Sequence, residues 1–109
     1  MADTTISAES GIVTVIYVFT CAEQHQPQLI AAIERATTEV FMRRPGFIAG
    51  SIHASRDRTR VVNYAQWASA DHFDALAGDP EAQDHQAQIM AVAESADPRL
   101  FDVRAVHKA

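Results

Sequence analysis

The run from Ile12 to Phe19 limits the folds open to this chain more than any other segment. All eight of its residues are β-branched or aromatic, which is typical of a β-strand. Because successive side chains of a strand point to opposite faces of its sheet, this strand is largely apolar on both faces. Both faces of the sheet therefore need a covering layer.

A helix and then a strand hairpin are predicted next. Pro27 suits the first turn of a helix, and apolar residues recur at helical spacing until Pro45-Gly46 ends it. Phe47–Ser55 and Arg60–Trp67 both have strand composition and are separated only by the short turn 56–59. The two segments therefore predict a β-hairpin.

The last third of the chain predicts helical segments and one more strand. A short helix carrying Phe73 precedes Asp79-Pro80, which starts a longer helix running to about Ala93. Asp97-Pro98 breaks the pattern, and Leu100–His107 is expected to be the last strand. The order β-α-β-β-α-β predicts an α+β, ferredoxin-like fold with the helices on one face of a four-stranded antiparallel sheet.

Helices on one side leave the second face of that sheet uncovered. The first strand of the hairpin has apolar residues on both of its faces. Ile48 and Ile52 are expected to lie on one face, and Phe47 and Ala49 on the other. A large exposed apolar patch is unusual in a monomer, and a second copy packed sheet to sheet would bury it. The sequence therefore predicts a homodimer.

Length and composition narrow the class of protein. The 109 residues suit one ferredoxin-like domain over 11–109, preceded by a flexible, polar N-terminal segment over 1–10. A net charge of −5 without a basic stripe disfavours a nucleic-acid or anionic-membrane partner. The single cysteine, the polar N-terminal segment and the lack of a long apolar window favour a cytoplasmic protein.

Asn63 and Trp67 are the residues that most suggest a binding site. Residues four apart on a strand share a face and lie roughly 13 Å apart. Asparagine is disfavoured inside a buried strand because burying its amide is costly, and Trp67 adds a flat wall to the same face. The pair predicts a pocket wall, although an asparagine can also satisfy backbone groups and a tryptophan can simply pack in a core.

From about Val13 to Val106 the chain resembles the antibiotic biosynthesis monooxygenase family, whose members are small dimeric α+β barrels. The resemblance rests on Val18-Phe19-Thr20, Pro45-Gly46-Phe47 and Asn63-Tyr64-Ala65-Gln66-Trp67. The Pro-Gly-Phe turn alone is a weak sign of the family. Its combination with Asn63-Tyr64-Ala65-Gln66-Trp67 at this spacing is a specific one. Within the family, the chain is most similar to the branch that oxidises aromatic polyketides of the anthrone and tetracenomycin type.

Members of that branch need neither metal nor organic cofactor. The resemblance thus implies a cofactor-independent monooxygenase that oxidises a polycyclic aromatic polyketide, an anthrone or naphthacenone, to a quinone with dioxygen. By the same resemblance the catalytic residues are Asn63, which hydrogen-bonds the substrate oxygen or the peroxide, and Trp67, which packs against the rings.

Four further residues are expected to line the substrate pocket: Tyr17, His53, Phe73 and His85. His85 could be a general base, since histidine titrates near neutral pH, or a solvated residue of its helix. Some relatives carry an asparagine in place of Tyr17 and a tyrosine in place of Phe73. The residue that handles the proton is therefore unassigned.

Two other functions stay open. A haem-degrading monooxygenase of the same superfamily would use Trp67 and, as the haem ligand, His85, although the first-strand asparagine of such enzymes is absent here. Alternatively, the protein could bind a small molecule, or fold a polyketide as a cyclase does, without oxidising it.

Overall fold

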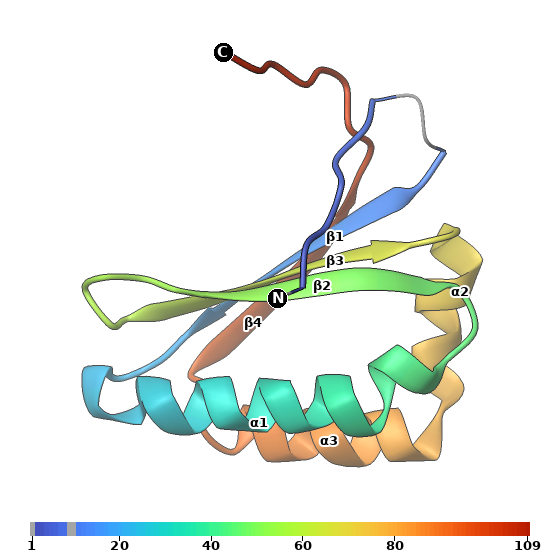
Figure 1. Ribbon diagram of the computed structural model, residues 1–109. Coiled ribbons are helices and arrows are strands. Elements are labelled where there is room, and N and C mark those ends of the chain that lie inside the picture. The colour runs from blue at the N-terminus through green and yellow to red at the C-terminus, as the bar shows by residue number, and fades with distance from the viewer. Residues whose placement is uncertain (1, 9–10) are drawn as a thin grey trace.

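The computed structural model describes residues 2–8 and 11–109, and its centre is a four-stranded antiparallel sheet (Figure 1). The strands are β1 (Val13–Thr20), β2 (Phe47–Ala54), β3 (Arg60–Trp67) and β4 (Ser95–Phe101). Their spatial order is β2-β3-β1-β4. The sheet and the order of the elements confirm the predicted α+β, ferredoxin-like architecture.

The helices lie on one side of this sheet. They are α1 (Gln26–Glu39), α2 (Ala70–Asp74) and α3 (Pro80–Met90), with short 3₁₀ turns η1 (Glu23–His25), η2 (Phe41–Arg43) and η3 (Ala75–Gly78). Figure 1 shows α1 and α3 side by side beneath the sheet, with α2 at one end. None of the helices in the described ranges is long and apolar enough to cross a membrane.

Part of the N-terminal segment lies against the outer face, the face of the sheet that points away from α1 and α3. The Thr4 hydroxyl donates to Gln66 Oε1 at 3.0 Å, and Gln66 Nε2 donates to the Thr5 carbonyl at 2.9 Å. Gln66 is buried as a result. Residues 1, 9 and 10 of the predicted flexible segment 1–10 lie outside the described residues.

The last strand differs from the expected Leu100–His107. β4 ends at Phe101 and contains Asp97 and Pro98, while residues 102–109 form no regular structure. Pro98 is tolerated because β4 is an edge strand that pairs only with β1, so its missing N–H can face away from the sheet. α3 also ends at Met90, earlier than the expected Ala93.

A β-bulge changes which face two residues of β2 occupy. Phe47 pairs with Trp67, yet Ala49 pairs with Gln66, so Ile48 is an extra residue in the ladder. Phe47 therefore shares the helix-covered face with Trp67, and Ala49 lies on the outer face. The expectation that Phe47 and Ala49 share a face is wrong because simple alternation does not count the bulged residue.

The core under the sheet is divided into two clusters. On β1, Tyr17 packs against the larger cluster at its border with the smaller one, and on β3, Asn63 belongs to neither cluster. These two residues are directly opposite each other in the ladder, so one cross-strand row with polar tips interrupts an otherwise apolar layer. The larger cluster is centred on Phe19, Leu29, Ile33, Val61 and Ile89, and the smaller one on Val15, Ala65 and Trp67.

Gly46 sets the contact between the start of β2 and α2. Its φ of +86° lies in the left-handed region that favours glycine. A Cβ at this position would lie 2.3 Å from Cγ of His72 in α2. The absence of a side chain at Gly46 thus lets α2, which carries Phe73, approach the sheet.

A glycine-to-alanine series tests this contact. Gly46→Ala meets both a positive φ and a clash, Gly11→Ala meets a φ of +72° in open space, and Gly78→Ala meets open space alone. We expect Gly11→Ala to cost about 1 kcal/mol and Gly78→Ala to be nearly neutral, while Gly46→Ala lowers Tm the most. Thermal unfolding followed by circular dichroism measures the order. Equal Tm values for the Gly46 and Gly11 variants would contradict the close approach of His72.

Candidate functional site

A cavity of about 460 Å³ lies between the sheet and the helices. This volume is within the range of roughly 300–1,000 Å³ that small-molecule sites occupy. Members of both core clusters line it, and the small residues Gly50, Ala65 and Ala82 leave the space open. The wall is therefore mostly apolar, and its few polar groups set what it can recognise.

Asn63 contributes its side-chain amide to this wall. The residue is only partly buried, lines the cavity, and its amide forms no hydrogen bond to any of the described residues. The amide is left open to the cavity, so a bound molecule can accept a hydrogen bond from it or donate one to it. Asn63 thus lies where a ligand-binding group is expected.

Trp67 forms an aromatic wall with two phenylalanines. Its side chain is 2% exposed, and it meets Phe47 edge to face with ring centroids 5.3 Å apart. Phe73 of α2 meets the same indole at a centroid distance of 6.1 Å. All three rings line the cavity, so they offer a rigid apolar surface against which a planar aromatic molecule can pack.

Tyr17 lies beside Asn63 and is held on two sides. Its ring stacks on that of Phe19 with centroids 4.4 Å apart, and Gln86 Nε2 of α3 donates to its hydroxyl at 2.8 Å. Burial raises the pKa of the Tyr17 phenol above its ordinary value of 10.0, while the hydrogen bond from Gln86 acts in the opposite direction. The phenol is therefore protonated at neutral pH and can donate.

Gln86 lines the cavity, although it was not among the predicted site residues. The available signal was its position in α3. Ala82, Gln86 and Ile89 recur at helical spacing, so an amide interrupts an apolar stripe just as Asn63 interrupts a strand.

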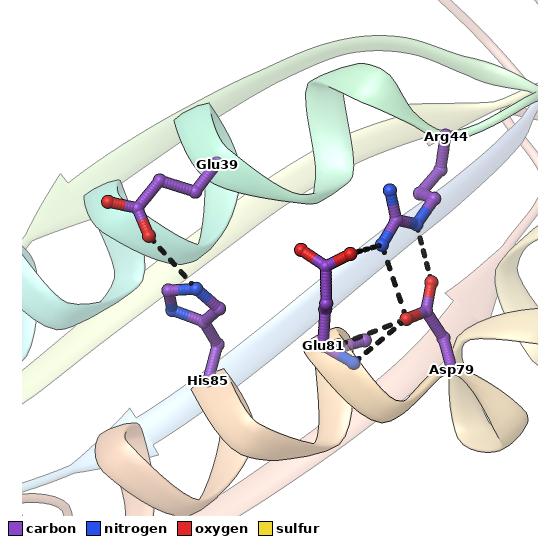
Figure 2. Close-up of polar contacts among 6 residues, drawn as sticks. Glu39, Arg44, Asp79, Glu81 and His85 are labelled. Carbon is purple, nitrogen blue, oxygen red and sulfur yellow. Dashed lines mark hydrogen bonds and ion pairs between the residues drawn. The ribbon is translucent and has the colours of Figure 1, made fainter.

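His53 and His85 do not line this cavity, which corrects two predicted positions. His53 pairs with Val62 on the outer face, where its Nε2 lies 2.8 Å from the Ser51 hydroxyl. His85 points from α3 toward α1, and its Nε2 lies 3.1 Å from Glu39 Oε2 (Figure 2). His53 points away from the helices because side chains alternate between the two faces of a strand. His85 immediately precedes Gln86 on α3, so when Gln86 faces the cavity, His85 faces α1 instead.

A second polar cluster fixes the start of α3. Figure 2 shows Arg44 in contact with both Asp79 and Glu81. Its Nη2 lies 3.4 Å from Glu81 Oε1. The same Asp79 carboxylate caps α3 by accepting from the N–H groups of Glu81 and Ala82. The hydrogen bond from Arg44 lowers the pKa of Asp79, so the cap is ionised at neutral pH. This cluster holds in place the helix that carries Gln86.

The polar side chains on the cavity are hydrogen-bonding groups rather than a set of metal ligands. Within residues 2–8 and 11–109, no three His, Cys, Asp or Glu side chains are grouped to hold a metal ion. The cavity instead carries hydroxyl and amide groups on Tyr17, Thr37, Asn63, Gln83 and Gln86, and one carboxylate, Asp74. The arrangement can orient a planar molecule and hydrogen-bond its oxygens.

Comparison with known proteins adds a family to this geometry. Residues 12–88 match the family described as antibiotic biosynthesis monooxygenase. Tetracenomycin-F1 monooxygenase of Streptomyces glaucescens is 38% identical over 81 residues, which are 74% of this chain and 72% of that protein.

Solved structures share the fold. SnoaB, a cofactor-independent oxygenase from Streptomyces nogalater, has a TM-score of 0.72 at 26% identity, covering 87% of this chain and 95% of that one. The monooxygenase ActVA-Orf6 of Streptomyces coelicolor, in complex with nanaomycin D, has a TM-score of 0.77 at 24% identity, covering 92% and 93%. At 24% identity, the similarity to ActVA-Orf6 shows only that the fold is shared.

The position of Tyr17 predicts how its phenol titrates. The chain has two tyrosines, so Tyr64→Phe leaves Tyr17 as the only phenol to observe. In this background we expect phenolate absorbance to appear with a midpoint above pH 10, because burial disfavours the charged form. Gln86→Leu should raise the midpoint further, since it removes the bond that lowers the pKa. A midpoint below 10, or a lower one in the Gln86 variant, would contradict this environment.

Proposed function

We propose that this chain oxidises a polycyclic aromatic polyketide to a quinone with dioxygen. The chain belongs to the antibiotic biosynthesis monooxygenase family and is a monooxygenase. The observation that carries the proposal is the unpaired Asn63 amide in an apolar cavity walled by Trp67. The activities named for tetracenomycin-F1 monooxygenase and for SnoaB, a cofactor-independent oxygenase, support it. We extend the absence of a metal or organic cofactor to this chain on the same grounds.

The reaction requires little from the protein beyond binding of the substrate. A phenolic anthrone loses a proton from its central CH₂ group, and the resulting anion transfers an electron to dioxygen. The two radicals combine to form a C–O bond, protonation gives a hydroperoxide, and loss of water leaves the C=O group of the quinone. One CH₂ group and one O₂ thus become one C=O group and one water.

The cavity residues have distinct roles in this reaction. The rings around Trp67 orient the flat substrate in a largely apolar space. The Asn63 amide donates to the oxygen on which negative charge develops, and it acts more strongly there than it would in water. The predicted catalytic roles of Asn63 and Trp67 are retained here as part of the proposal.

The haem-degrading alternative has no support from the site. That function requires His85 to reach a bound haem, whereas its imidazole pairs with Glu39 between α1 and α3 and does not line the cavity. A cyclase-like function would use the same cavity without consuming oxygen. Oxygen uptake therefore separates that alternative from the proposed reaction.

We also propose that the protein is a cytoplasmic homodimer joined through the outer faces of its sheets. Apolar residues form neighbouring cross-strand pairs on that face, Ile16 with Tyr64 and Val18 with Val62. Phe101 extends the patch onto β4 and is 45% exposed. A second copy would remove this surface from water.

An oxygen-electrode assay tests the reaction directly. With anthrone as substrate, wild-type protein should form quinone faster than the uncatalysed solution and consume one O₂ per quinone formed. Asn63→Ala should lower kcat about tenfold or more, since a hydrogen bond to a charged group is worth about 1.5–3 kcal/mol. His53→Ala, on the opposite face of the sheet, is the matched control and should keep the wild-type rate.

Two results would refute this function. One is a wild-type rate equal to the uncatalysed rate. The other is an Asn63→Ala variant that keeps full activity while remaining folded. Conversion of a polyketide substrate to a product of unchanged oxidation state, equally fast without oxygen, would instead support the cyclase-like function.

Light scattering tests the dimer. The chain has a mass of 11.9 kDa, so wild-type protein at micromolar concentration should scatter with twice that mass. Val62→Lys should yield monomers because it places a charge in the centre of the outer-face patch. Ala31→Lys, at an exposed position of α1, should remain dimeric. A wild-type monomer would contradict the proposed interface.

A further inference from the structure

We propose that Tyr17 and Asn63 form a pair of hydrogen-bond donors that holds the anionic oxygen of the bound substrate, with Gln86 positioning Tyr17. We call this pair the Tyr17–Asn63 clamp. It deepens the proposed function, because it rests on that function for the substrate class, a planar phenolic molecule that becomes an anion.

The two residues of the clamp are neighbours across the sheet. Tyr17 of β1 and Asn63 of β3 are directly opposite in the antiparallel ladder and share the face that lines the cavity. Side chains at such positions have Cβ atoms about 4.5–5.5 Å apart. Because the two side chains start from opposite positions on the face that lines the cavity, we place one substrate oxygen between the Asn63 amide and the Tyr17 hydroxyl.

The hydrogen bond between Tyr17 and Gln86 leaves the phenolic hydrogen available. Gln86 Nε2 is the donor and the Tyr17 oxygen is the acceptor, at 2.8 Å. No described residue accepts the hydrogen of that hydroxyl. Donation by Gln86 also stabilises negative charge on the phenol oxygen, which makes the O–H group a stronger donor. Gln86 thus acts through Tyr17 as a positioning residue.

Two other possible donors on the cavity wall, Thr37 and Gln83, are already engaged. The Thr37 hydroxyl donates to the Ile33 carbonyl at 2.9 Å, and Gln83 donates to the Ala77 carbonyl. Phe73 has no donor to offer. The hydroxyl hydrogen of Tyr17, which no described residue accepts, and the amide of Asn63, which bonds to none of them, lie in one row of the sheet.

Both members of the clamp are neutral, which suits a group that appears only during the reaction. Burial keeps Tyr17 protonated at neutral pH, so the proton stays on the phenol and the interaction is a hydrogen bond, not a proton transfer. Neutral donors bind the neutral carbonyl oxygen of the substrate weakly, and they bind that oxygen more strongly once loss of the CH₂ proton has given it negative charge. The clamp should therefore raise kcat more than it lowers KM.

Alizarin, a planar dihydroxyanthraquinone, provides a test that needs no turnover. Its visible spectrum changes when a phenol ionises, so titrating the bound dye reports how strongly the protein favours the anion. Wild-type protein should lower the apparent pKa of the bound dye relative to free dye. Tyr17→Phe should remove about one pKa unit of that effect, equal to about a tenfold loss of affinity for the anion.

Matched variants separate the clamp from a general disturbance of the fold. Tyr17→Phe keeps the ring that stacks on Phe19, and its Tm checks that the fold persists. Gln86→Leu should give a smaller shift in the same direction as Tyr17→Phe. Gln88→Leu on the exposed side of α3 and Tyr64→Phe on the outer face should leave the pKa of the dye unchanged.

The outcomes distinguish the clamp from the proposed function. Wild-type protein that does not bind alizarin, or binds it without lowering its pKa, overturns the clamp, as does a Tyr17→Phe variant with an unchanged dye pKa. A Gln86→Leu variant identical to wild type overturns the role of Gln86. If the dye pKa shifts as expected but no quinone forms from anthrone, the clamp stands and the oxygenase reaction fails.

Discussion

The antiparallel register of β1 against β3 places Tyr17 opposite Asn63, and the site depends on that pairing. A shift of one residue would put the side chains of Tyr17 and Asn63 on opposite faces of the sheet. Apolar pairs on either side hold the register, Phe19 opposite Val61 in the larger cluster and Val15 opposite Ala65 in the smaller one. The polar row therefore lies in the middle of the sheet because the apolar pairs beside it must be buried.

The helical layer turns this row into a pocket. Large side chains separate α1 and α3 from the sheet within the larger cluster, while small residues such as Gly50 and Ala82 leave the space beside it open. Gly46 and the Asp79 cap then fix α2 and α3 in place. The same packing that stabilises the fold thus delivers Phe73 and Gln86 to the cavity.

Much of this arrangement follows from the sequence. The order of elements was readable from hydrophobic periodicity, and the shared face of Asn63 and Trp67 follows from strand alternation. Tyr17 and Phe73 also line the cavity as expected. These successes share a cause, because burial patterns along a single element are local properties of the chain.

The failures concern relations between elements. Nothing local marks Ile48 as a bulged residue, so the move of Phe47 to the face of Trp67 appears only in the pairing with β3. Pro98 predicts a break in the strand unless the strand is known to lie at the edge of the sheet. The rotation of α3 about its axis decides whether His85 or Gln86 faces the sheet, and packing against α1 sets that rotation.

A crystal structure with a bound hydroxyanthraquinone would test the central claim most directly. We predict that the ligand rings pack against Trp67 and that one ligand oxygen lies within hydrogen-bond distance of both the Asn63 amide and the Tyr17 hydroxyl. A ligand bound outside the cavity, or one whose oxygens point away from that row, would contradict the account.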